Sequence, residues 1–303
     1  MKSLRFIAST WKPTTSWGRV ARGLAKYLEP PVDYRGIRDE PPQDLPKLDE
    51  IDLQLFWGAP FDLRVLGHID VLFTTWETTR CPFDSKFYTP RPGQIWATSA
   101  FAAKSLYADK IVRLGALPLP SAEKNITNDF IFGSIGNFSQ RKGFDLIIRA
   151  FLHSFENKNA HLWLKSNKPV PRWVPSHPQI KIITEELSEE QLSQFYMNID
   201  YYIQASRGEG FGLCPLEAAS LGIPSIVTDG SALSELIDDK MIFGVHTEPR
   251  KSVMGGTWFE ADIEDLEKKM LMAYQGEIGF HSLNNVRTIE DTAHDIRRLT
   301  EEI

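Results

Sequence analysis

Residues 206–224 read SRGEGFGLCPLEAASLGIP, and this stretch decides the fold. The apolar run that precedes it, Ile199–Gln204, predicts a buried strand. Pro215 suits the first position of a helix, and Gly222 and Pro224 end that helix after about two turns. A strand, a glycine-rich turn and a helix in this order are typical of α/β proteins that bind a ligand at the carboxyl ends of their strands.

Strands and helices alternate on both sides of this stretch. In the second half we predict strands at Asp129–Ile135, His161–Lys165, Ile180–Thr184, Ile199–Gln204 and Ser225–Thr228, and helices over Gly143–Phe155, Ser188–Met197 and Pro215–Leu221. In the first half we predict strands at Leu4–Ser9, Ile51–Trp57, Val71–Thr75, Gln94–Thr98 and Lys110–Leu114, and a helix that ends near Leu28. The fold class is therefore α/β, with two Rossmann-like, doubly wound domains that face each other across a cleft.

The length of 303 residues favours two domains, because single hydrophobic cores stop growing at roughly 250–300 residues. Pro118 and Pro120 favour an extended crossing between the two domains. We predict an N-terminal domain over residues 1–120, a C-terminal domain over residues 121–285, and an amphipathic helix within residues 286–303.

Composition excludes several classes of protein. The net charge of −6 argues against broad binding to a nucleic-acid backbone. No apolar run is long enough to cross a bilayer and the N-terminus lacks a secretory core, which predicts a cytoplasmic location. Cys81 and Cys214 lie far apart and are expected to be reduced. Arg19, Arg22 and Lys26 share one side of a predicted helix, which is either a solvated face or a contact for an acidic acceptor or membrane.

The glycine-rich turn carries the residues that suggest chemistry. Its glycines let a ligand approach the backbone, and the free N–H groups of the following helix favour an anion. Glu209 and Glu217 bracket the turn, and carboxylates accept paired sugar or ribose hydroxyls through charge-assisted hydrogen bonds. Taken alone, Glu217 fits equally well as an acidic side chain that complements the dipole of the first helical turn. Together with Glu209 and the glycines, it predicts a ligand site.

Glu209 and Glu217, with the residues that follow them to Ile226, resemble the E-x7-E signature of the retaining GT-B glycosyltransferases of family 4. The resemblance implies that the C-terminal domain binds a nucleotide-sugar donor and the N-terminal domain binds the acceptor. It implies that Glu209 orients the donor sugar as a catalytic residue and that Glu217 holds the ribose. The remaining donor contacts that it implies in this turn are Gly210, Phe211, Gly212 and Leu213.

A second stretch, residues 131–143, reads IFGSIGNFSQRKG and resembles the donor-phosphate loop of the same family. Lys142 is in register with the lysine of the family, which implies a point charge on the donor diphosphate and a catalytic role. Asn137 stands where an arginine is common in the family, and Arg141 is the candidate replacement for that cation. Without the resemblance, Arg141 and Lys142 read as surface residues before a helix.

The resemblance is thinner in the first half of the chain. Glu77 is a candidate cleft residue in place of a histidine that contacts the donor sugar in many members, and a surface role fits it equally well. The glycine-rich loop of the family is reduced to residues 14–18, with Gly18 as its glycine. The terminal helix resembles the return helix that packs on the N-terminal domain, and an ordinary C-terminal helix is the alternative.

The resemblance also implies front-face transfer of a hexose with retention and without a metal ion, in line with the absence of an Asp-x-Asp motif. No cofactor is expected beyond the donor substrate, most simply UDP- or GDP-linked. The acceptor stays open among glycans, lipid-linked intermediates, proteins and modified nucleic acids. A nucleotide-sugar epimerase and a sugar-nucleotide binding protein that has lost catalysis are the alternatives in function.

Overall fold

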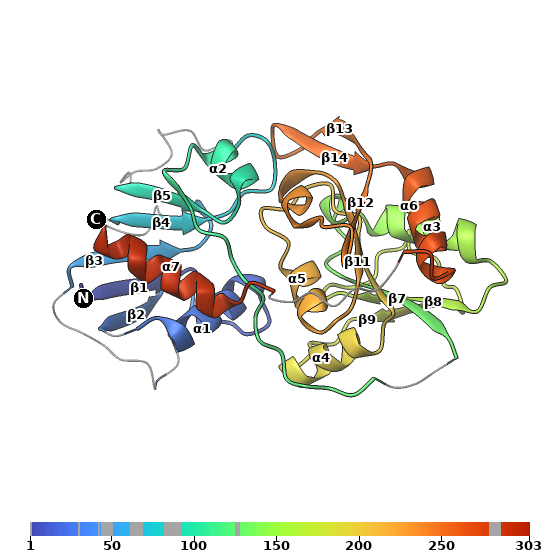
Figure 1. Cartoon of the computed structure of the whole chain (residues 1–303), viewed down its shortest axis with the longest axis horizontal. Helices are drawn as coiled ribbons and strands as arrows, with labels where there is room; N and C mark the ends of the chain where they lie inside the picture. The colour runs from blue at the N-terminus through green and yellow to red at the C-terminus, as the bar shows by residue number, and fades with distance from the viewer. Residues whose placement is uncertain are drawn as a thin grey trace. The chain divides into compact units, whose positions relative to one another are not determined.

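The computed structural model describes residues 2–29, 31–41, 43, 51–60, 69–81, 92–124, 128–278 and 286–303. The chain divides into two compact units, each built on its own sheet (Figure 1). Unit 1 comprises Met1–Pro118, Val253–Gly256 and Arg287–Ile303, and unit 2 comprises Leu119–Ser252 and Thr257–Val286. Among the described residues, no helix combines the length and the apolar character that crossing a membrane requires.

Unit 1 contains a six-stranded parallel sheet in the order β2-β1-β3-β4-β5-β6. The strands are β1 (Leu4–Ala8), β2 (Val32–Gly36), β3 (Leu53–Trp57), β4 (Val71–Thr74), β5 (Gln94–Ala97) and β6 (Lys110–Ile111), and the helices are α1 (Ser16–Tyr27), α2 (Ala100–Leu106) and α7 (Ile289–Glu301). Every residue of β4 is buried, as expected for a strand covered on both faces.

Helix α7 packs beside α1 in unit 1, although most of the chain separates them (Figure 1). Thr288 begins α7 with a capping box, and the apolar positions of the helix are buried. A Cβ atom added to Gly23 of α1 would lie 2.6 Å from the Leu117 side chain and 3.2 Å from Ile289, so the two segments meet closely there. The buried Arg297 donates to the backbone oxygens of Lys2 and Pro31.

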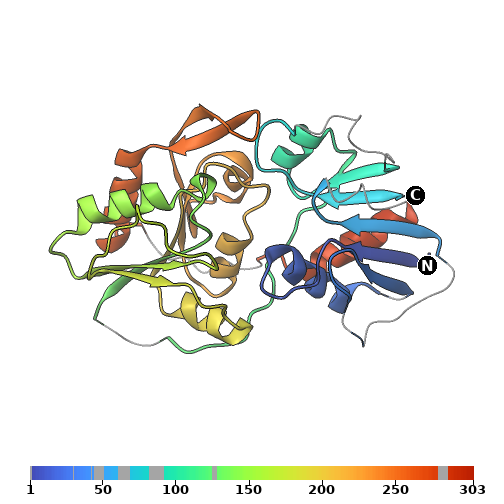
Figure 2. The same ribbon diagram turned by 180° about the vertical axis from the view of Figure 1, so that it is seen from behind.

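Unit 2 contains a second six-stranded parallel sheet in the order β12-β11-β10-β7-β8-β9. Its strands are β7 (Phe130–Ile135), β8 (Ala160–Lys165), β9 (Ile180–Ile183), β10 (Tyr201–Gln204), β11 (Ser225–Thr228) and β12 (Ile242–Val245), and its α-helices are α3 (Phe144–Phe155), α4 (Glu189–Met197), α5 (Leu213–Ser220) and α6 (Ile263–Tyr274). Helices α3 and α6 lie side by side on this sheet (Figure 2). Two doubly wound α/β domains are therefore confirmed.

An antiparallel ribbon interrupts this alternation in unit 2. It pairs β13 (Thr247–Lys251) with β14 (Thr257–Ala261). We did not predict the ribbon from the sequence, nor did we predict β2, β12, α2 or α6. Strand β13 is mostly exposed and carries Glu248, Pro249 and Arg250, so it lacks the apolar run that identifies a buried strand.

Helix α5 begins at Leu213, which corrects the predicted start at Pro215. Gly212 has a φ of 109°, a left-handed conformation that glycine adopts without strain, and it opens the helix two residues earlier. Pro215 is still tolerated because the N–H groups of the first helical turn have no partner within the helix. Glu217 consequently lies in the second turn and is fully buried, so dipole complementation in the first turn does not explain it.

The basic face predicted on α1 is also corrected. Lys26 is exposed, but Arg19 and Arg22 are half-buried, and Nε of Arg22 donates to the Trp11 backbone oxygen at 2.6 Å. Gly18 lies in the first turn of α1 rather than in a loop. A Cβ atom there would lie 2.0 Å from the Lys12 backbone oxygen, so packing of this turn requires the glycine.

Candidate active site

The loop after β7 is shaped by its own sequence. The side-chain oxygen of Asn137 accepts a hydrogen bond from the Ser139 N–H at 3.1 Å, which turns the chain away from the strand. A single 3-10 turn, Gln140–Lys142, then leads to Gly143 with a φ of 68°. A Cβ atom on Gly143 would lie 1.9 Å from the backbone oxygen of Ala205, so a side chain has no room here. Asn137 therefore shapes the loop and supplies no cation.

The loop after β10 lies against the loop after β7. Strands β7 and β10 are neighbours in the parallel sheet, so their carboxyl ends meet at the same edge. The Arg207 N–H donates to the Arg141 backbone oxygen at 2.7 Å and joins the two loops directly. The Glu209 N–H donates to the Ser231 hydroxyl at 3.0 Å, which fixes the second loop from its other side.

Two cations converge on one carboxylate at this edge. Lys142 Nζ lies 2.6 Å from Glu209 Oε1, and Arg141 Nη1 lies 3.1 Å from the same oxygen. Arg141 Nη1 also donates to the Gly208 backbone oxygen at 2.7 Å. Burial alone raises the pKa of Glu209, but Lys142 and Arg141 outweigh it and lower that pKa to about 2. The structure thus brings together three of the residues that the sequence analysis singled out.

The lowered pKa of Glu209 predicts how the free energy of unfolding depends on pH. Because the folded-state pKa lies below its ordinary value of 4.5, the carboxylate stabilises the fold fully above that pH and loses this effect as the pH falls toward about 2. We expect the stability difference between the wild type and Glu209→Gln to be constant from pH ~7 to ~5 and to shrink below. Urea unfolding at stepped pH measures it, and a difference that stays constant down to pH ~3 would contradict it.

Glu217 lies in the buried interior of α5. Its Oε2 atom accepts a hydrogen bond from the Tyr196 hydroxyl at 3.0 Å, which fixes the direction of the carboxylate. Cys214 lies one turn earlier, where burial, and next the nearby Glu217, raise the pKa of its thiol. From the sequence we predicted only that Cys214 is a reduced thiol, because no motif marks it as a neighbour of Glu217.

The other predicted residues fall in two places. Phe211 is buried within the turn, and a Cβ atom on Gly212 would lie 2.7 Å from the Leu233 side chain. Leu213 is the first residue of α5, and Gly210 stands in the turn before it. Glu77 and Gly18 both belong to unit 1. Glu77 lies in the segment that follows β4, and Gly18 lies in α1.

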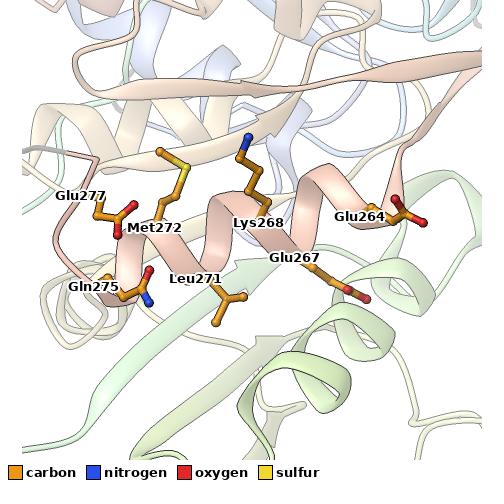
Figure 3. A pocket seen from close by; sticks show the side chains of 7 residues that line it. All are labelled: Glu264, Glu267, Lys268, Leu271, Met272, Gln275 and Glu277. Atoms are coloured by element: carbon orange, nitrogen blue, oxygen red, sulfur yellow. The ribbon is translucent and has the colours of Figure 1, made fainter.

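A shallow pocket of about 440 Å³ lies elsewhere in unit 2, along α6. Its lining side chains include Glu264, Lys268, Leu271 and Glu277, and they point in different directions around the helix (Figure 3). Polar groups that bind a small ligand converge on it, which these do not. The charge cluster around Glu209 is therefore the better candidate for a functional site.

A protein-family comparison matches most of unit 2. Residues 129–274 match the family model described as "Glycosyl transferases group 1", and this range contains both loops of the charge cluster. Unit 2 therefore contains the region that is similar to group 1 glycosyltransferases. The epimerase alternative is therefore not favoured.

Curated relatives of this chain are named as glycosyltransferases. The chain is 30% identical over 126 residues to the O-antigen biosynthesis glycosyltransferase WclY of Escherichia coli, a match that covers 38% of the chain and 33% of WclY. It is 24% identical over 238 residues to the lipopolysaccharide core biosynthesis mannosyltransferase LpcC of Rhizobium leguminosarum bv. viciae, covering 65% of the chain and 68% of LpcC. The chain thus spans about a third of the length of WclY.

Solved structures share the fold over the whole chain. Sucrose-phosphate synthase (tll1590) from Thermosynechococcus elongatus superposes with a TM-score of 0.68 at 14% identity, covering 100% of this chain and 99% of that one. Anabaena Alr3699/HepE, solved in complex with UDP and glucose, gives a TM-score of 0.67 at 10% identity and covers 100% of both chains. At such identities the likeness shows the fold alone, which is the GT-B architecture.

Proposed function

We propose that the chain is a retaining glycosyltransferase of family 4 that moves a hexose from a nucleoside diphosphate donor to an acceptor hydroxyl. The observation that carries the proposal is the convergence of Lys142 and Arg141 on Glu209, at the strand edge where α/β proteins bind ligands. The two cationic side chains suit a diphosphate, and the adjacent carboxylate suits the hydroxyls of a sugar. Unit 2 would then hold the donor, and residues 1–120 would bind the acceptor.

The proposed chemistry uses the charge that develops on the leaving group. As the bond between the anomeric carbon and the diphosphate oxygen breaks, the nucleoside diphosphate gains negative charge, which Lys142 and Arg141 would stabilise more strongly than in the ground state. The N–H group of Leu213, at the start of α5, would add to this field. The acceptor oxygen bonds to the anomeric carbon on the face that the phosphate leaves, and its proton passes to the departing phosphate. No covalent enzyme nucleophile takes part, and no metal ion is required.

The two glutamates would hold the two sugars of the donor. Glu209 lies beside the phosphate-binding cations, so its carboxylate would accept hydrogen bonds from hydroxyls of the transferred hexose. Glu217 is buried and its direction is fixed by Tyr196, as required of a group that accepts both ribose hydroxyls. Because these hydrogen bonds are charge-assisted, removal of either carboxylate should weaken the hold on the corresponding sugar of the donor more than loss of a neutral hydrogen bond would.

The relatives guide the choice of donor and acceptor. HepE was solved with UDP and with UDP-glucose, and LpcC is named as a mannosyltransferase, which supports a UDP- or GDP-linked hexose. WclY and LpcC are named for O-antigen and lipopolysaccharide core biosynthesis, which supports a glycan or lipid-linked glycan as acceptor over a protein or nucleic acid. The donor substrate would be the only bound nucleotide, without a further cofactor.

A donor screen tests this function. UDP- and GDP-linked glucose, galactose and mannose are each added to the protein, and a bound donor should raise the melting temperature because it binds only the folded state. The stabilising donor is then incubated with lipopolysaccharide core acceptors, and we expect release of the nucleoside diphosphate together with a larger glycan. Conversion of the donor to its epimer without an acceptor would contradict the proposal, and so would binding without release across all acceptors.

A further inference from the structure

Arg207 is a buried charge in the loop that follows β10 of unit 2. Its residue is only 1% exposed, and its guanidinium contacts three different segments of the chain. The Nη1 and Nη2 atoms donate to the two carboxylate oxygens of Asp145 at 2.9 and 2.6 Å. Nη2 and Nε donate to Glu260 of strand β14, with the Nη2 contact at 3.0 Å, and Nη1 also donates to the backbone oxygen of Gln140.

Packing alone does not explain why a charged side chain is buried here. A buried ion pair is often no more stabilising than apolar residues of similar volume, because both charges must leave water. Burial disfavours the charged guanidinium, yet the hydrogen bonds that it donates to Asp145 and Glu260 outweigh burial and raise the pKa of Arg207 above its ordinary value. The side chain therefore stays charged, with its fork of donors held in one direction.

The backbone of Arg207 makes the same connections as its side chain. Its N–H donates to the Arg141 backbone oxygen, and its carbonyl accepts from the Phe259 N–H, both at 2.7 Å. Arg207 thus contacts the backbone of Gln140 through its side chain and the backbone of Arg141 through its main chain. These two residues directly precede Lys142, whose ammonium group defines the charge cluster.

We propose that Arg207 is a positioning residue, which fixes the Gln140–Lys142 turn against strand β14 so that the Lys142 ammonium group meets the donor diphosphate. What Lys142 binds rests on the proposed function; that Arg207 holds the turn does not. Misplacement of a catalytic group by about 1 Å costs on the order of a hundredfold in rate, so a rigid support for a loop lysine has a direct effect on transfer. Asp145 and Glu260 act here by orienting the guanidinium.

Two variants and one matched control test this role. Arg207→Lys keeps the buried charge but loses the fork of donors, and Asp145→Asn weakens the same contact from a half-exposed position, so the fold should survive in both. Arg250→Gln is the control, because Arg250 contacts Glu260 at 2.7 Å from the exposed side and does not touch the turn. Hydrogen exchange of residues 139–144 reports the turn, and exchange of α6 reports the rest of unit 2.

We expect Arg207→Lys to speed exchange of residues 139–144 by about tenfold while α6 exchanges at the wild-type rate, and to weaken binding of UDP or GDP, titrated as probes, by about tenfold. Arg250→Gln should change neither quantity. Wild-type exchange of the turn in Arg207→Lys, or equal acceleration throughout unit 2, would overturn the proposal. If the wild type bound neither probe while the local acceleration persisted, Arg207 would retain its role and the proposed donor would be wrong.

Discussion

Glu209→Gln is expected to lower sugar transfer by roughly 10²- to 10³-fold and to leave binding of the nucleoside diphosphate intact or tighter. Glutamine keeps the shape of the side chain but removes the charge that orients the sugar hydroxyls. It also removes the anion that now occupies Lys142 and Arg141, at 2.6 and 3.1 Å, so a diphosphate no longer competes with it. Sugar transfer should therefore fall in this variant while diphosphate binding does not.

Steady-state kinetics measures the first effect and calorimetric titration with UDP or GDP measures the second. Glu264→Gln serves as the matched control, because this glutamate lies at the start of α6 and should leave both values unchanged. Equal losses in transfer and in diphosphate binding would instead show that Glu209 supports the loop and does not contact the sugar.

Lys142→Met is expected to lower kcat/KM by roughly 10²- to 10³-fold and to weaken diphosphate binding in the same variant. Methionine fills similar space but offers no charge to the leaving group. The fold should persist because Arg141 remains 3.1 Å from Glu209 and keeps the buried carboxylate paired. Removal of the lysine should therefore affect every nucleotide sugar, whichever base or hexose it carries.

Kinetics with the best donor from the screen, together with thermal denaturation, separates catalysis from folding in this variant. Lys268→Met on α6 is the matched control, since it removes an ammonium group from the surface of the same unit. A melting temperature that falls while kcat/KM per folded molecule stays at the wild-type value would show that Lys142 has only a structural role.

The strands of both sheets were largely predictable because their apolar runs are short and bounded by polar residues. Strand β2 was missed because its sequence, Val32–Gly36, contains Asp33 and Arg35. Asp33 is fully buried beside Arg5 at 2.6 Å, and this partner lies on another strand that local sequence does not reveal. Local periodicity cannot predict a strand whose buried charge depends on a partner far away in the sequence.

The site was predictable in its residues and not in its contacts. Glu209 and Lys142 are 67 positions apart, and only the pairing of β7 with β10 brings their loops to one edge. The burial of Arg207 could not be predicted, because an arginine before a glycine-rich turn is usually expected to be exposed. Its partners, Asp145 and Glu260, are known only from the structure. The start of α5 was misjudged because the left-handed Gly212 opened the helix earlier than Pro215 indicated.

The most direct test of the proposed donor site is a crystal structure of the protein with the nucleoside diphosphate that stabilises it most. We predict that the diphosphate lies within hydrogen-bond distance of Lys142 Nζ, beside the start of α5, with the ribose at Glu217 and with Glu209 released from at least one of its two cations. A nucleotide bound elsewhere, with the pairs between Glu209 and both cations unchanged, would contradict it.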